Sequence, residues 1–272
     1  MLIALCRLLS IIRCAPPAVN ARVGPPGLVA DAPPCDNGAM QYLDLTLPMP
    51  AENLALDEAL LEQAEEAAEP REVLRLWEPR EMMVVVGRSS RVAEEVHVEA
   101  CRARGIPILR RPSGGAAVVL GPGCLMFALV LSYQQRPALR AIDHAHRFVL
   151  STLAAALRPM VPQVRCRGTS DLALSDLKFS GNSVRCRREH LLYHGTVLYG
   201  LSLGLIDELL PLPPRQPAYR NGRGHAAFVT NLPLPAEAIR QALVAAWEAT
   251  NPCEDWPQEY TARLAAEKYA TL

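Results

Sequence analysis

The sequence predicts an α+β fold in which a mixed, largely antiparallel sheet is flanked by helices. The chain has 272 residues, half of them hydrophobic, and no net charge, which is typical of a globular protein with a substantial core. Segments with strand-like patterns mostly follow one another through short turns, and this favours antiparallel pairing over a doubly wound parallel sheet. After residue 40 there is no repeat and no strong linker, so we expect a single domain over residues 40–272.

The first 39 residues have a different character. Residues 2–12 are apolar but are interrupted by Arg7, and this run is too short to cross a bilayer. Its charge lies inside the apolar stretch rather than before it, unlike a secretory signal. Residues 15–39 are rich in Pro, Gly, Ala and Asn. We therefore expect residues 1–39 to be a disordered N-terminal extension, and we expect no membrane association.

Helices and strands alternate through the remaining sequence. The first half predicts a helix from Pro50 that ends before Pro70, a helix near 93–104, and strands at 73–77, 82–86, 106–109, 116–120 and 124–132. The last two strands flank a Gly-Pro-Gly turn. The second half predicts an alanine-rich helix at 138–158, a strand-rich region at 163–200 with turns at 175–176 and 187–190, and short helices near 204–210, 235–249 and 257–270.

Composition excludes several classes of function. The 28 basic and 28 acidic side chains leave no basic excess for nucleic acid. The eight cysteines never form a Cys-x-x-Cys pair, which argues against a zinc site and a disulfide framework. We therefore expect no metal ligated by the chain and a cytoplasmic location.

Among those 28 basic residues only Lys178 and Lys268 are lysines. We expect Lys268, close to the C-terminus, to lie at the solvated end of a helix. Lys178 lies mid-chain in Asp-Leu-Lys-Phe-Ser-Gly, where a compact ammonium offers chemistry that a planar guanidinium does not. The count alone is also compatible with an ordinary exposed turn residue.

Two clusters of residues contain candidate catalytic or binding side chains. In the first, Arg110 and Arg111 precede Gly114 and Gly115, a combination suited to an anion because paired glycines expose backbone N–H groups. A plain hairpin turn with surface arginines is the alternative.

In the second cluster, Asp171 and Lys178 flank the Ser175-Asp176 turn, so they fall on neighbouring strands and can face one cavity. Gly181 permits close approach beyond them, and His194 follows in His-Gly-Thr. A capping carboxylate and a core histidine are the alternatives for Asp171 and His194.

Together these clusters resemble the lipoate–protein ligase and octanoyltransferase family, which shares its catalytic domain with biotin–protein ligases. The resemblance covers residues 41–232. Its parts occur in the family's order: Asn-Leu-Ala-Leu-Asp-Glu from residue 53, the Arg-Arg and Gly-Gly loop, the Asp-Leu segment, Lys-Phe-Ser-Gly and His-Gly-Thr. The resemblance implies a biotin/lipoate protein ligase-like, class II synthetase-like catalytic domain.

It also implies acyl transfer to a lysine of a lipoyl carrier domain, in the E2 subunits of 2-oxoacid dehydrogenases or the glycine cleavage H protein. In the ligases, lipoate or octanoate is activated with ATP and Mg²⁺ to an acyl-adenylate. Lys178 matches the lysine that contacts the acyl carbonyl and the phosphate. The resemblance further assigns substrate binding to Arg110, Arg111, Gly114, Gly115, Asp171, Gly181 and His194.

Departures from the family pattern keep alternatives open. Ala116 stands where a glycine or arginine is usual, and Leu120 stands where a histidine is common. A transferase would take its acyl group from acyl carrier protein, and Cys166 lies near, though not at, the position of one transferase group's nucleophile. A non-catalytic lipoyl-domain accessory protein is a third reading. About forty residues follow the shared region, too few for the additional C-terminal domain of many ligases, so we expect the chain to act without that domain or with a separate partner.

Overall fold

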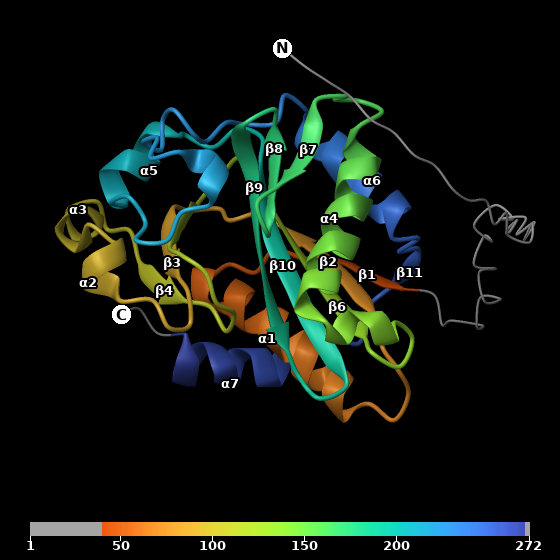
Figure 1. Ribbon diagram of the computed structural model, residues 1–272. Helices are drawn as coiled ribbons and strands as arrows, with labels where there is room; N and C mark the ends of the chain where they lie inside the picture. The colour runs from red at the N-terminus through yellow and green to blue at the C-terminus, as the bar shows by residue number, and fades with distance from the viewer. Residues whose placement is uncertain (1–39, 270–272) are drawn as a thin grey trace, which may run out of the picture. The chain divides into compact units, whose positions relative to one another are not determined.

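The computed structural model describes residues 40–269, which all belong to one compact unit (Figure 1). The expected disordered extension, residues 1–39, lies outside the described residues. Within the described part of the chain, no helix is both long enough and apolar enough to cross a membrane.

The main element is an eight-stranded sheet, which confirms the predicted mixed and largely antiparallel arrangement. The parallel pairings join the first three strands in sheet order, and all other neighbours are antiparallel. In sheet order the strands are β11 (Asn251–Pro252), β1 (Gln41–Asp44), β2 (Val73–Trp77), β6 (Cys124–Ser132), β10 (His190–Leu198), β9 (Leu177–Cys186), β8 (Asp171–Leu174) and β7 (Val164–Arg167).

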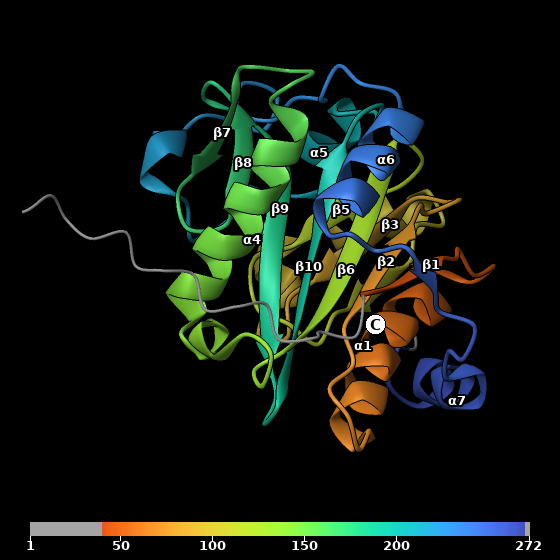
Figure 2. The same cartoon turned by 90° about the vertical axis from the view of Figure 1, so that its right-hand side faces the viewer.

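Helices cover both faces of this sheet, which explains the unbroken apolar sequence of β6. Phe127 and Leu129 pack in the core cluster that includes α4 (Ile142–Leu157) and α6 (Ala236–Ala246). Ala128 and Val130, on the opposite face, pack against α1 (Pro50–Glu66). A strand buried on both faces gains from apolar residues at every position. Figure 2 shows α4 and α1 on different sides of the central strands.

A second sheet of three strands lies beside the first and carries the Gly-Gly loop. Its order is β4 (Ile108–Arg110), β3 (Met83–Val86) and β5 (Val118–Leu120). The strands predicted on either side of the Gly-Pro-Gly turn both form, but β5 pairs with β3 while β6 belongs to the large sheet. The turn therefore passes the chain between sheets. A Cβ at Gly123 would lie 2.2 Å from the carbonyl carbon of Gly200, and its φ is +85°, so only glycine fits there.

The helix predicted near 93–104 is two short helices, α2 (Val92–Glu95) and α3 (Val98–Ala103). Between them Val96 is buried, and the backbone N–H of His97 donates to the carbonyl of Leu209 in α5 (Gly204–Leu209) at 2.9 Å. This long-range hydrogen bond replaces the helical one, and local propensity could not reveal it. The described residues also form two 3₁₀ helices, η1 (Pro137–Arg140), which contacts α4, and η2 (Ala218–Arg220).

The C-terminal helix α7 (Gln258–Lys268) lies against α1 (Figure 1). The buried carboxylate of Glu58 accepts hydrogen bonds from Lys268 Nζ at 2.6 and 2.7 Å and from the hydroxyl of Tyr269 at 2.6 Å. Lys268 is the last residue of α7 and is exposed, as expected for a solvated helix end, but the sequence did not predict this pairing with Glu58. Its ammonium is half exposed, but it neutralises a buried acid and anchors α7 to α1.

Candidate active site

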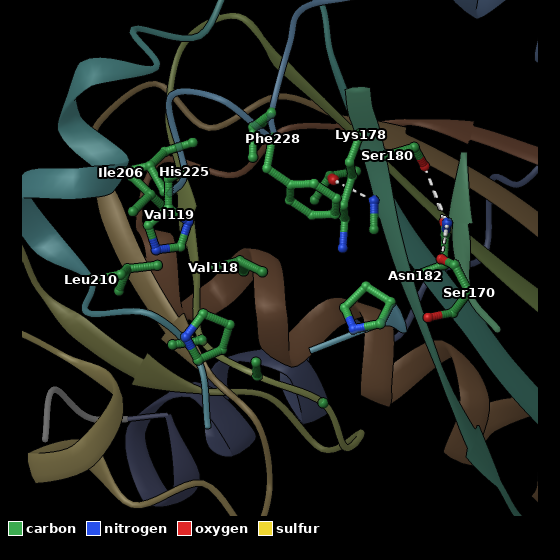
Figure 3. A pocket seen from close by; sticks show the side chains of 18 of the residues that line it. Val118, Val119, Ser170, Lys178, Ser180, Asn182, Ile206, Leu210, His225 and Phe228 are labelled. Carbon is green, nitrogen blue, oxygen red and sulfur yellow. Dashed lines mark hydrogen bonds between the residues drawn. The ribbon is translucent and has the colours of Figure 1, made fainter. Parts of the chain in front are cut away.

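A cavity of about 220 Å³ lies between the Gly-Gly loop, strand β9 and the segment 206–229, here called the cap. One part of its wall is apolar and includes Val118, Ile206, Leu210 and Phe228. Another part carries the basic side chains Lys178, Arg111, Arg215 and Arg220. In Figure 3, Ile206 and His225 lie toward one side of the view and Asn182 toward the other, with Lys178 between them.

Lys178 reaches the cavity because of a β-bulge. Leu172 pairs with Ser180, but the next residue, Ala173, pairs with Lys178, so Phe179 is an extra residue on β9. A one-residue shift moves a side chain to the other face of a sheet. The bulge therefore places Lys178 on the face shared with Asp171 and leaves Phe179 in the core.

Asp171 lies on the strand next to that of Lys178, as predicted, and holds the ammonium of Lys178. The Nζ–Oδ1 distance is 2.7 Å, and the carboxylate is buried while the lysine is 29 % exposed. The expectation that both residues face one cavity is wrong for Asp171, which is not part of the cavity wall and orients Lys178 from behind it. A compact cation fixed in this way is suited to stabilising negative charge that develops on a bound group.

Gly181 makes the conformation of Lys178 possible. A Cβ at position 181 would lie 2.9 Å from both Cε and Nζ of Lys178, because the lysine side chain runs back over its own strand. The sequence predicted that some group approaches the backbone closely at Gly181, and this group is the side chain of Lys178 itself.

The cap is tied directly to this ion pair. The hydroxyl of Tyr219 donates to Asp171 Oδ2 at 2.8 Å, so each carboxylate oxygen has its own partner. Burial and the charge of Asp171 both raise the pKa of Tyr219, which keeps the hydroxyl a donor. The backbone N–H of Lys178 donates to the carbonyl of Phe228 at 2.8 Å, and Thr230 N–H donates to the carbonyl of Lys178 at 2.9 Å.

The side chains of the two arginines before the Gly-Gly loop donate hydrogen bonds to backbone carbonyls of this loop and of the neighbouring loop. Arg110 Nη1 donates to the carbonyls of Gly87 and Ser90 at 2.7 and 2.9 Å and does not line the cavity. Arg111 donates to the carbonyls of Gly114 and Ala116 at 2.6 and 3.0 Å. Burial lowers the pKa of Arg111 to about 10, which still leaves it charged at neutral pH.

Close backbone packing explains the glycines of this region. A Cβ at Gly87 would lie 2.0 Å from the carbonyl oxygen of Gly115, so the neighbouring loop lies directly against the Gly-Gly loop. Gly115 has φ +93° and lines the cavity, whereas Gly114 does not line it.

His194 lies behind the Gly-Gly loop rather than in the cavity wall. Its Nε2 is 2.5 Å from the hydroxyl oxygen of Ser113, and its Nδ1 is 3.7 Å from Asp57 Oδ2. Ser183 is the cross-strand partner of His194, and its hydroxyl donates to the carbonyl of Gly114 at 2.9 Å. These two side chains hold consecutive loop residues against the large sheet.

Cys166 does not line this cavity. It lies on β7 with His144, Arg147 and Phe148 around a separate surface hollow. Cys166 is exposed, and partial desolvation raises the pKa of its thiol, with Arg158 opposing. No described cysteine lines the cavity that contains Lys178.

Sequence reasoning missed the contribution of the cap. Tyr219 orients Asp171, while Arg220 and His225 line the cavity. Glu95 of α2 also lines the cavity and was not predicted. The cap has no hydrophobic periodicity, so no pattern marked these residues. The signal available was a dense run of basic and aromatic side chains in a proline-rich stretch at 211–228.

Comparisons with known proteins identify the family of this chain. The lipoyl protein ligase A/B catalytic domain matches residues 49–247. The chain belongs to this family. A lipoate-protein ligase A candidate from Aeropyrum pernix is 31 % identical over 203 residues, covering 75 % of this chain and 72 % of that protein. An octanoyltransferase from Geobacillus kaustophilus is 25 % identical over 198 residues, covering 64 % and 70 %. Three further relatives are longer, and the matches span 43–56 % of their length.

Solved structures of the family share the fold. A bi-partite lipoate protein ligase from Thermoplasma acidophilum, studied with its E2 lipoyl domain, superposes with a TM-score of 0.73 at 22 % identity and covers 86 % of this chain and 95 % of that chain. A lipoate-protein ligase A bound with ATP gives a TM-score of 0.71 at 21 % identity, covering 86 % and 97 %. These likenesses confirm the predicted lipoate ligase-like fold.

Proposed function

We propose that the chain attaches lipoate or octanoate to a lysine of a lipoyl carrier domain, by way of an acyl-adenylate made from ATP. The observation that carries this proposal is the position of Lys178. Its ammonium, fixed by Asp171, lies in the wall of a cavity that combines an apolar part with several cations. An acyl chain suits the first part, and a phosphate suits the second.

In the activation step, a carboxylate oxygen of the acid attacks the α-phosphorus of ATP, and pyrophosphate leaves. In the transfer step, the amine of the carrier lysine attacks the acyl carbonyl, and AMP leaves with the electron pair of the broken bond. Both steps concentrate negative charge near one carbon or phosphorus atom. Lys178 is placed to stabilise that charge in both, because a preorganised cation needs little reorganisation as the charge develops.

Mg²⁺ would accompany ATP. Residues 40–269 contain no cluster of three or more His, Cys, Asp or Glu side chains with metal-site geometry. Mg²⁺ commonly binds through substrate phosphates with one or two carboxylates, and Glu95 is the acidic side chain of the cavity wall. The described residues therefore suit an ion carried by the triphosphate.

The second candidate is an octanoyl transferase with acyl carrier protein as donor, which the Geobacillus relative favours. A covalent cysteine mechanism requires a thiolate near Lys178. The location and raised pKa of Cys166 argue for the adenylate route.

The deciding experiment supplies four acyl donors in parallel to the purified chain with a lipoyl domain: lipoate plus ATP, octanoate plus ATP, synthetic lipoyl-adenylate, and octanoyl acyl carrier protein. Intact mass of the lipoyl domain reports the transfer. We expect modification from the adenylate, and from the free acids with release of pyrophosphate. Modification only from acyl carrier protein, lost in Cys166→Ser, would establish the transferase instead.

The adenylate arm separates activation from transfer. A chain that uses lipoyl-adenylate but not free acid with ATP would need a further subunit for activation. We further propose that the carrier is an E2 or H-protein lipoyl domain and that the chain acts in the cytoplasm.

A further inference from the structure

Two arginine side chains are buried in the described part of the chain, and their surroundings differ. Arg75, with no exposed surface, forms an ion pair with Asp57 at 2.5 Å and donates to the carbonyls of Asn53 and Leu45. Arg220 is only 4 % exposed, yet none of the carboxylates within residues 40–269 lies at ion-pair distance from it. A buried charge without a counter-ion is costly, so its position needs an explanation.

Neutral groups hold the guanidinium of Arg220 in place. Its Nε donates to the carbonyl of Arg223 at 2.8 Å, and its Nη2 donates to His225 Nδ1 at 3.3 Å. The group also stacks on the ring of Phe228, 4.7 Å from the centroid. Burial lowers the pKa of Arg220, with the charge of Asp207 opposing, but an arginine remains a cation at neutral pH. The orientation is therefore fixed, and none of the described carboxylates forms an ion pair with the guanidinium.

His225 serves as an acceptor for Arg220. Its Nε2 is 3.2 Å from the carbonyl oxygen of Pro211, which can only accept, so Nε2 carries the proton and Nδ1 is free to accept. Burial lowers the pKa of His225, which favours this neutral form. The carboxylate of Asp207 accepts the backbone N–H groups of His225 and Ala226 at 3.2 and 3.1 Å and fixes the loop.

Other charges around the cavity do not cancel that of Arg220. Lys178 and Arg215 line the same cavity and add positive charge. Asp171 is engaged by Lys178, and Glu95 accepts the backbone N–H of Ala117 at 2.8 Å. The cavity therefore presents more positive than negative charge to a ligand, and a bound anion would supply the missing counter-charge.

We propose that Arg220 is a phosphate-binding residue, which together with Lys178 holds the phosphate of the acyl-adenylate and of its nucleotide precursor. The proposal rests on the proposed function above. Phosphate is favoured over the carboxylate of the free acid because several cations surround one cavity, and the nucleotide precursor carries more negative charge than a single carboxylate. Unlike Arg75, which is paired with Asp57, Arg220 makes its hydrogen bonds within the fold to neutral groups.

The test is calorimetric titration of AMP, adenosine and octanoate into the full chain and into Arg220→Gln and Arg220→Lys. Arg220→Gln should weaken AMP binding by about ten- to a hundredfold, the range for a charged hydrogen bond, and should leave adenosine unchanged. Arg220→Lys should recover part of the loss. Equal AMP binding by wild type and Arg220→Gln, or no AMP binding by wild type, overturns the inference. So does an octanoate affinity that falls when AMP affinity does not.

Thermal unfolding provides the structural control. Arg220→Gln should lose much less stability than Arg75→Gln, because it removes hydrogen bonds to neutral groups and no ion pair, whereas Arg75→Gln leaves Asp57 unpaired. A large loss of stability in Arg220→Gln would indicate a structural role and would also overturn the inference. Acylation of a lipoyl domain is measured separately. A chain that binds AMP through Arg220 but acylates nothing refutes the proposed function and leaves this inference standing.

Discussion

Replacing Gly181 with alanine should move the ammonium of Lys178 while leaving the fold intact. Gly181 is not in the left-handed region, so alanine can adopt its backbone conformation. The new Cβ would lie 2.9 Å from Cε and Nζ of Lys178. These atoms end a flexible side chain, so Lys178 is the group that yields.

The structure sets the size of the effect. Lengthening the Lys178–Asp171 contact from 2.7 Å to about 3.5 Å weakens the attraction by roughly 1.4 kcal/mol at an effective dielectric constant of about 20. Water screens a lysine that is 29 % exposed, so we expect at most about 1 kcal/mol of lost stability. A displacement of about 1 Å at a reacting centre can cost a hundredfold in rate, so kcat should fall by about that factor.

The assay is transfer from synthetic lipoyl-adenylate to a lipoyl domain, followed by mass spectrometry, with urea unfolding on the same preparations. Gly204→Ala is the matched control, because no atom lies within 4 Å of the added Cβ at the start of α5. Wild-type kcat in Gly181→Ala, or a loss explained by the unfolded fraction, would refute the reasoning that Lys178 must lie over Gly181.

Three further predictions follow from other contacts. His194→Ala should loosen the Gly-Gly loop, because it removes the contact with Ser113, and should raise KM for the acid more than it lowers kcat. His194→Gln should restore part of the loss. Steady-state kinetics that show a change in kcat alone would contradict this prediction. Glu58→Gln should weaken the attachment of α7 and lower the free energy of unfolding by about 1–3 kcal/mol in urea, with unchanged activity per folded molecule. Burial lowers the pKa of both His146 and His225, so below their ordinary value of 6.5 the unfolded chain binds more protons and stability falls as pH is lowered. Urea unfolding at several pH values should show this fall, and His225→Gln should reduce it.

Sequence reasoning was most successful where a local signal exists. The helix from Pro50, strand β2 and the turn at Ser175-Asp176 are marked by periodicity, proline and turn residues, and the structure confirms them. It was less successful where a distant contact overrides local preference. The break between α2 and α3 depends on a hydrogen bond from His97 to Leu209, more than a hundred residues away.

The predicted site residues also fall into two groups. Lys178, Arg111, Gly115 and Gly181 line the cavity, as their motifs indicated. Other predicted residues act from behind the wall: Asp171 on Lys178, His194 on Ser113, and Arg110 on the adjoining loop. Motif matching gives a residue's place in the chain, and it does not say whether the side chain touches a ligand or positions a neighbour.

The sequence by itself determined the order of helices and strands and singled out Lys178, because hydrophobic period, turn residues and an unusual lysine are properties of short segments. Only the tertiary structure decided which side chains share the cavity. A one-residue bulge turns Lys178 toward Asp171, and the fold of the cap buries Arg220 without a carboxylate. Both outcomes depend on register and on contacts between distant segments. A buried charge can be recognised as unpaired only after the whole chain has folded around it.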